Sequence, residues 1–223
     1  MSNQYRLMTL FNDGGFMMYP LILCSLIALG VIIAKVWTLN IAHRDSRKLL
    51  NDIADLSAGG RLSEAIETAA NTRGPVAAIL LAGLRRVQER ETGSRRSSKD
   101  VTKAISTTGI IELDFLERGL TVLATIANVA PMLGFLGTVI GMILAFQAIE
   151  IAGQVDPQLV ASGIKVALIT TAAGLTIAIP VNVAYNYFIT QIDRLIRDME
   201  EGSQSVIGLI WSIEDRSGYR EAS

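Results

Sequence analysis

Three long stretches of this chain contain no charged residue, and this feature limits the possible folds more than any other. The stretches are 16–34, 119–149 and 166–192, and the charged residues gather between them. Only 18% of the residues are charged, where typical soluble domains have about 25%. A helix needs about 20 apolar residues to cross a bilayer. The sequence therefore predicts an all-α integral membrane protein with three transmembrane helices.

The positions of lysine and arginine predict how the chain is oriented. Thirteen of the 20 lie within 40–118 and four within 193–223, whereas 150–163 has none. Basic residues favour the cytoplasmic side of a membrane. We therefore expect the N-terminus and the 150–163 loop to face out, and the tail to face the cytoplasm. No small-x-small cleavage motif follows the first stretch, so we interpret it as a retained anchor and not as a cleaved signal peptide.

These observations predict seven consecutive segments. They are an outer N-terminal segment (1–15), a first span (16–39), a cytoplasmic helical region (40–118), a second span (119–150), an outer loop (151–162), a third span (163–192) and a cytoplasmic C-terminal helix or tail (193–223). Lys35 lies near the end of the first span, where its stem is expected to reach the lipid headgroups.

The predicted cytoplasmic region has helical spacing with several breaks. We expect a turn at 58–60, a second break at Gly74-Pro75 and a basic, serine-rich loop at 93–99. From Val101 the pattern runs without a clear stop into the second span, which predicts one long helix extending into the cytoplasm. The helix that begins at Pro75 is expected to bury one apolar face, formed by Val76, Ile79, Leu80 and Leu84.

Each of the two later spans has a narrow face of small residues around a threonine. On a helical wheel, the residues near Thr138 are Ala127, Pro131, Gly134, Gly141, Met142 and Ala145. Those near Thr171 are Ala167, Gly174, Ala178, Asn182 and Tyr185. Two interpretations remain open. Small faces let helices pack closely, and hydroxyls and amides can also line a narrow ion path.

Proline and the missing acidic residues add two further constraints. Pro131 and Pro180 each remove a backbone donor inside a span, which predicts either a kink or a hydrated lumen. No acidic residue lies within any of the three uncharged stretches. Since a proton relay in a membrane normally needs one, a partner chain is expected to supply the carboxylate if this protein conducts protons.

Specific motifs connect these spans to a known family. Residues 130–143 (APMLGFLGTVIGMI) closely resemble the second-span signature of the MotA/TolQ/ExbB proton-channel family. Residues 167–175 (ALITTAAGL), with the Ala178-Ile179-Pro180 that follows, resemble its third-span signature. The first span and the cytoplasmic segment are similar to those of the ExbB/TolQ branch. The resemblance covers nearly the whole chain.

This resemblance implies a homopentamer in the bacterial inner membrane, with a periplasmic N-terminus and a cytoplasmic C-terminus. It also implies two copies of a single-span partner similar to ExbD or TolR, whose membrane aspartate carries the proton. Thr138 and Thr171 match the family threonines on the ion path, and Asn182 shares the face of Thr171. Val166 occupies a position where much of the ExbB/TolQ branch has glutamate.

Other functions remain open at this stage. One is a non-conducting membrane scaffold, and another is a sodium-driven MotA-like subunit. An enzyme is poorly supported, because His43 is the only histidine and the sequence has no metal-ligand cluster or phosphate-binding loop. We expect no cofactor, and a net charge of −1 gives no reason to expect nucleic-acid binding.

Overall fold

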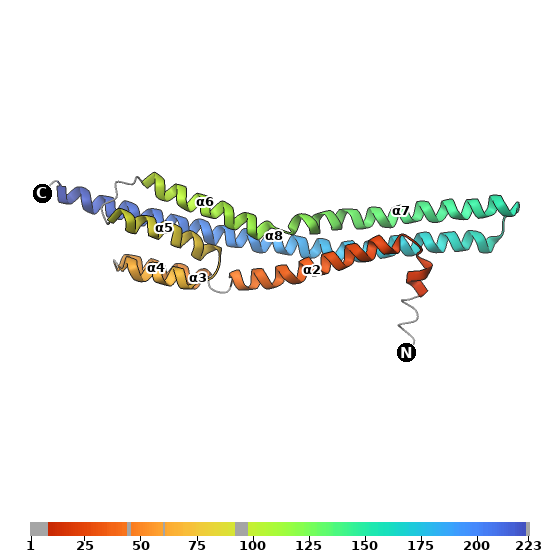
Figure 1. Cartoon of the computed structure of the whole chain (residues 1–223), viewed down its shortest axis with the longest axis horizontal. Helices are drawn as coiled ribbons and strands as arrows, with labels where there is room; N and C mark the ends of the chain where they lie inside the picture. Colours follow the sequence, from red (N-terminus) through yellow and green to blue (C-terminus); the bar gives the residue numbers. More distant parts are fainter. Residues whose placement is uncertain (1–8, 44–45, 60, 92–97, 222–223) are drawn as a thin grey trace, which may run out of the picture. The chain divides into compact units, whose positions relative to one another are not determined.

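The structure is a computed structural model that describes residues 9–43, 46–59, 61–91 and 98–221. Those residues are helical apart from short turns and contain no strand (Figure 1). The helices are α2 (Met18–His43), α3 (Ser46–Ala58), α4 (Leu62–Asn71), α5 (Pro75–Glu91), α6 (Ser98–Glu117), α7 (Leu120–Ala152) and α8 (Pro157–Glu221).

Three helical segments are long and apolar enough to cross a membrane. They are Met18–Asn40, Lys99–Ala152 and Val160–Gly208. Each overlaps one of the uncharged stretches from which the spans were predicted, and the last two contain theirs entirely. The predicted all-α fold with three spans is therefore confirmed.

Most of the helix breaks in the middle of the chain fall where glycine and proline predict them. α3 ends at Ala58 and α4 begins at Leu62, while residue 60 lies outside the described residues. Pro75 is the first residue of α5, a position that needs no backbone donor. The predicted loop at 93–99 lies largely outside the described residues. The predicted C-terminal boundary of this loop was wrong, because Ser98 and Lys99 belong to α6.

The structure has two helices where the sequence predicts one continuous helix from Val101 into the second span. α6 ends at Glu117 and α7 begins at Leu120. Gly119 between them has φ 89° and ψ −15°, a left-handed conformation that costs other residues about 1–2 kcal/mol. The missed break was therefore a single glycine at the start of the uncharged stretch.

The two later spans are longer as helices than predicted. α7 reaches Ala152, and α8 begins at Pro157, so the predicted outer loop at 151–162 shrinks to 153–156. Gly153 ends α7 with φ 66° and donates its N–H to the Ile149 carbonyl. α8 then continues to Glu221 through the predicted C-terminal segment. Pro131 and Pro180 both lie inside these helices.

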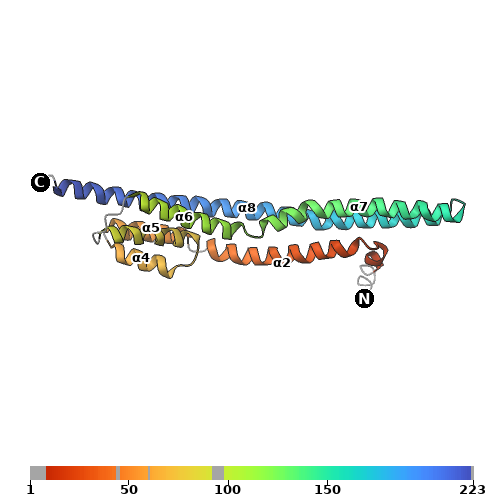
Figure 2. The same ribbon diagram turned by 45° about the horizontal axis from the view of Figure 1, so that its top comes forward.

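The chain divides into two compact units, which are described separately. The first comprises Met1–Ala34 and Gly119–Phe188, and the second comprises Lys35–Arg118 and Ile189–Ser223. In the second unit, α5 packs against α4 and α6, and α3 packs against α4 (Figure 2). The predicted apolar face of α5 is buried there, since Val76, Ile79, Leu80 and Leu84 are at most 2% exposed.

Lys35 points into the second unit and not to the lipid headgroups, so the prediction for this residue was wrong. Its side chain is buried, and Nζ donates a hydrogen bond of 2.6 Å to the carbonyl oxygen of Leu116. Leu116 lies in the last turn of α6, where carbonyl groups have no partner within the helix. A lysine at such an end satisfies a carbonyl and complements the helix dipole.

Candidate functional site

The closest contact within the first unit joins α7 to the first part of α8. The two helices run antiparallel and lie side by side in both ribbon views (Figures 1 and 2). A Cβ built on Gly174 would lie 2.6 Å from the Ala130 carbonyl oxygen. A Cβ on Gly134 would lie 3.0 Å from the Thr170 carbonyl oxygen. The two backbones therefore touch, which only glycine and alanine allow.

Most of the small residues predicted from the sequence lie in this contact. Gly134, Gly141, Ala145, Ala167, Gly174 and Ala178 are all buried. Pro131 and Tyr185 are partly buried, and Pro180 is exposed. Within one chain, Gly134, Gly141, Gly174, Ala145 and Ala167 lie where α7 contacts α8.

Sequence reasoning missed several members of the same contact. A Cβ built on Gly137 would collide with the Thr170 side chain, and one on Gly163 would collide with Ala145. Thr170 itself is fully buried, and its hydroxyl bonds the Val166 and Ala167 carbonyls of its own helix. The spacing of Gly137 from Gly134 and Gly141 was a usable signal, because residues three and four apart share a helix face.

The two candidate threonines lie at the edge of the contact. Both side chains are partly buried. The Thr171 hydroxyl donates across the contact to the Gly134 carbonyl oxygen at 3.3 Å, and the Thr138 hydroxyl donates to the Phe135 carbonyl oxygen of its own helix at 2.6 Å. Thr171 lies level with Gly134, and Thr138 lies about one helical turn further along α7, so the two threonines are offset from each other by up to about one turn along the pair.

Helix geometry places both threonines on one side of the helix pair. At 100° per residue, each lies roughly 60–70° from the centre of its helix's buried face. The rotation from Gly134 to Thr138 has the same sense as the rotation from Gly174 to Thr171. Each rotation is viewed along its own helix from N- to C-terminus. Because the two helices are antiparallel and face each other, rotations of equal sense move both threonines to the same side of the helix pair. The surface around Thr138 and Thr171 is called the threonine flank below.

The bonding of the two hydroxyls leaves oxygen lone pairs available. A hydroxyl has one donor hydrogen and two lone pairs, and both threonines use the hydrogen on a carbonyl. Their oxygens can therefore accept a hydrogen bond or coordinate a cation, as oxygen ligands in channels do. Asn182 is exposed further along α8, and its side-chain oxygen accepts a hydrogen bond of 3.3 Å from Asn186.

The acidic residues of the described first unit lie away from this flank. They are Asp13, Glu150 and Asp156, and the last two lie at or beyond the end of α7. Asp13 pairs with Lys165 of α8 at 2.5 Å. Beside this ion pair, a Cβ on Gly14 would lie 3.2 Å from the Ile169 side chain. On the helical wheel Lys165 and Ile169 are well over 100° from Thr171, so the N-terminal segment contacts another side of α8.

The ion pair gives a testable prediction about the first unit. Lys165→Met or Asp13→Asn is expected to lower the free energy of unfolding by about 1 kcal/mol, because each leaves one charge without its partner. The combined reversal Asp13→Lys with Lys165→Asp is expected to restore most of the loss. Thermal unfolding in lipid nanodiscs measures the change in stability. The control is Arg61→Met, which breaks the exposed ion pair between Arg61 and Glu64 at the start of α4. A reversal no better than the single variants would contradict an interaction between these two residues.

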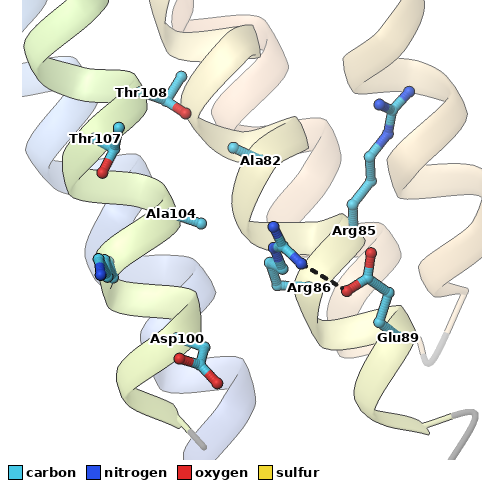
Figure 3. A pocket seen from close by; sticks show the side chains of 9 residues that line it. Ala82, Arg85, Arg86, Glu89, Asp100, Ala104, Thr107 and Thr108 are labelled. Atoms are coloured by element: carbon cyan, nitrogen blue, oxygen red, sulfur yellow. Dashed lines mark hydrogen bonds and ion pairs between the residues drawn. The ribbon is translucent and has the colours of Figure 1, made fainter. Parts of the chain in front are cut away.

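The second unit has a polar cavity of about 700 Å³ between α5 and α6 (Figure 3). Its wall contains Arg85, Arg86, Glu89, Asp100 and Lys103. Arg86 is paired with Glu89 at 2.9 Å (Figure 3). The lining has no histidine or cysteine, and no group of three metal-binding side chains occurs in the described part of the chain. This cavity therefore has neither the cysteine nor the histidine that many acyl-transfer and hydrolytic sites use.

The helices and the threonine flank together define a class of protein. It is a multi-pass membrane protein in which two spans pack through glycine and carry hydroxyl groups at the edge of their contact. The sequence pattern of the MotA/TolQ/ExbB proton channel family matches residues 71–201, which is more than half of the chain. The chain belongs to this family.

Individual relatives place the chain close to the ExbB and TolQ members. It is 32% identical over 192 residues to the "putative biopolymer transport protein ExbB homolog" of Methanothermobacter thermautotrophicus, covering 86% of this chain and 66% of that protein. It is 31% identical over 216 residues to the biopolymer transport protein ExbB of Pseudomonas putida, covering 91% and 64%. It is 44% identical over 87 residues to the Tol-Pal system protein TolQ of Haemophilus influenzae, covering 39% and 38%.

Proposed function

We propose that this chain is the ion-channel subunit of an inner-membrane motor complex that uses the proton motive force to do mechanical work on envelope partners. The observation that carries the proposal is the threonine flank. Two hydroxyls from different spans lie on one side of a glycine-packed helix pair, within about one helical turn of each other along it. Membership of a proton channel family supports the same function.

The proposed mechanism needs an acidic group from another chain. The flank supplies oxygen ligands but no carboxylate that could take up and release a proton. A single-span partner similar to ExbD or TolR, with an aspartate in its membrane helix, would provide one. With that helix beside the flank, Thr138 and Thr171 accept hydrogen bonds from the proton-carrying group, and Asn182 extends the polar surface along α8.

The assembly we propose places α7 and α8 around a common axis. Five copies of this chain surround two copies of the partner, and each threonine flank faces the axis. Gly134, Gly141, Ala145, Ala167, Gly174 and Ala178 hold α7 and α8 together, while Pro131, Pro180 and Tyr185 lie at the edges of this pair. The N-terminus is periplasmic, and the second unit and the C-terminus are cytoplasmic, because most lysines and arginines lie there.

A non-conducting membrane scaffold is the second candidate. Two observations favour it: close helix packing alone explains the buried small residues, and Val166 stands where much of the ExbB/TolQ branch has glutamate. A sodium-driven subunit is a variant of the first proposal, because hydroxyl and amide oxygens also coordinate sodium. The scaffold predicts that loss of the two hydroxyls has no functional effect.

Native mass spectrometry of this chain, co-expressed with a single-span protein similar to ExbD or TolR, tests the proposed assembly. We expect one mass corresponding to five copies of this chain and two of the partner. The partner's aspartate changed to asparagine serves as the control, since it removes proton transfer but keeps the helix. A complex without the partner, at any protein concentration, would contradict the motor and favour the scaffold.

A further inference from the structure

A second cavity of the second unit lies where the end of α2 meets the turn between α4 and α5. Its volume is about 440 Å³, within the range of small-molecule sites. The wall is largely small and apolar, and includes Ala42 of α2, Ala77 and Leu81 of α5, and Phe115 of α6. Gly74 permits the tight turn at its rim with φ 134°, a conformation that other residues rarely adopt.

The cavity lies at the end of the first apolar segment, which indicates a position near the membrane surface. Thr38 lines it and lies in the last turn of the apolar segment Met18–Asn40. Trp37 beside it is 72% exposed, and tryptophan prefers the boundary between hydrocarbon and water. Phe115 at the cavity is 54% exposed. An apolar opening at this depth is in reach of the glycerol and acyl groups of bilayer lipids.

Two opposite charges line the same cavity. They are Arg73, in the turn before α5, and Glu112 of α6. Arg73 is exposed and Glu112 is partly buried. Neither has an ion-pair partner among the residues that the structure describes. One unpaired cation and one unpaired anion beside an apolar wall match a ligand that has both charges and an apolar body.

We infer that this cavity binds a phospholipid with a phosphoethanolamine headgroup. The lipid phosphate accepts hydrogen bonds from the Arg73 guanidinium, whose planar donors suit phosphate oxygens. The primary ammonium of the lipid donates to the Glu112 carboxylate, and the glycerol and upper acyl chain contact Leu81 and Phe115. A lipid that carries only the negative charge leaves Glu112 unpaired. This inference depends on the position of α2 in the membrane and does not depend on ion conduction.

Native mass spectrometry of the full chain in detergent, titrated with lipids of matched acyl chains, tests the inference. We expect phosphatidylethanolamine to bind about tenfold more tightly than phosphatidylglycerol, because it makes one more charge-assisted hydrogen bond. Glu112→Gln is expected to abolish that preference, and Arg73→Gln to weaken the binding of both lipids. Glu67→Gln and Arg47→Gln, which change exposed charges outside the cavity, are expected to bind as the unaltered chain does.

Three results would overturn the inference. Equal affinity of the unaltered chain for the two lipids would show that the headgroup is not recognised. A lipid preference that survives Glu112→Gln would place any lipid site elsewhere. Arg73 and Glu112 variants that change the number of subunits and leave lipid binding unchanged would show that a second copy of the chain covers the cavity.

Discussion

Gly174→Ala is expected to cause a large loss of stability, because it adds a methyl group where the α7 and α8 backbones touch. The new methyl group would lie 2.6 Å from the Ala130 carbonyl oxygen and 3.1 Å from the Gly134 Cα. Both obstacles are backbone atoms, so no side chain can rotate away and the helices must separate. Overpacking of this kind costs roughly 1–3 kcal/mol. Thermal unfolding of the purified chain in nanodiscs measures the loss.

Gly30→Ala is the matched control for this substitution. Gly30 also lies inside an apolar spanning segment, but no atom lies within 4 Å of a Cβ built there. Since alanine favours a helix over glycine by about 0.5–1 kcal/mol, this variant is expected to be as stable as the original chain or more stable. Equal stability of the Gly174→Ala and Gly30→Ala variants would contradict backbone contact between α7 and α8.

Thr171→Val is expected to lower ion flux by at least about tenfold without dissociating the complex. Valine has nearly the volume of threonine but lacks the hydroxyl, so the flank loses an oxygen ligand that the proposed ion path needs. Thr138→Val is expected to act in the same way, and Thr171→Ser is expected to retain most of the flux. A pH-sensitive dye inside proteoliposomes that contain this chain and its partner measures the flux.

Thr176→Val is the matched control for the loss of a hydroxyl. Thr176 is exposed on α8, and its hydroxyl bonds the Ala172 carbonyl of its own helix at 2.7 Å. It lies roughly 140° from Thr171 on the helical wheel, so its substitution is expected to leave the flux unchanged. Full flux in a chain with both Thr138→Val and Thr171→Val would refute the proposed ion path and favour the scaffold.

The spans were predictable because charge and apolarity give a strong local signal. Nineteen or more uncharged residues have few other stable environments than a bilayer. Helix ends depend on weaker signals, and two of them were missed. Gly119 follows the charged residues Glu117 and Arg118 with no proline beside it, and α7 and α8 extend into the predicted outer loop on either side of Gly153.

Most small residues of the α7–α8 contact were predictable from the sequence, but the orientation of the two helix faces was not. The helical wheels were centred on Thr138 and Thr171, whereas the buried faces are centred near Gly134 and Gly174. A single sequence shows that small residues share a face, and it does not show which of them touches another helix. The threonines therefore lie at the edge of the contact, and the fully buried hydroxyl is that of Thr170.

Contacts between distant residues had no signal in the sequence at all. Lys35 and Leu116 are 81 residues apart, and Asp13 and Lys165 are further apart still. A charged side chain gives no indication of its partner until the helices are arranged in space. The lipid cavity has the same origin, since Arg73 and Glu112 come together only when α4, α5 and α6 pack.

Thiol labelling of the assembled complex tests most directly whether the threonine flank faces a hydrated axis. Cys24, the only cysteine, is first changed to alanine. Thr138→Cys, Thr171→Cys and Thr176→Cys are then introduced one at a time and exposed to a small water-soluble thiol reagent. We predict labelling at 138 and 171 that falls when the partner is co-expressed, and no labelling at 176. Labelling at 176 alone, or at none of the three with or without the partner, would contradict the proposed ion path.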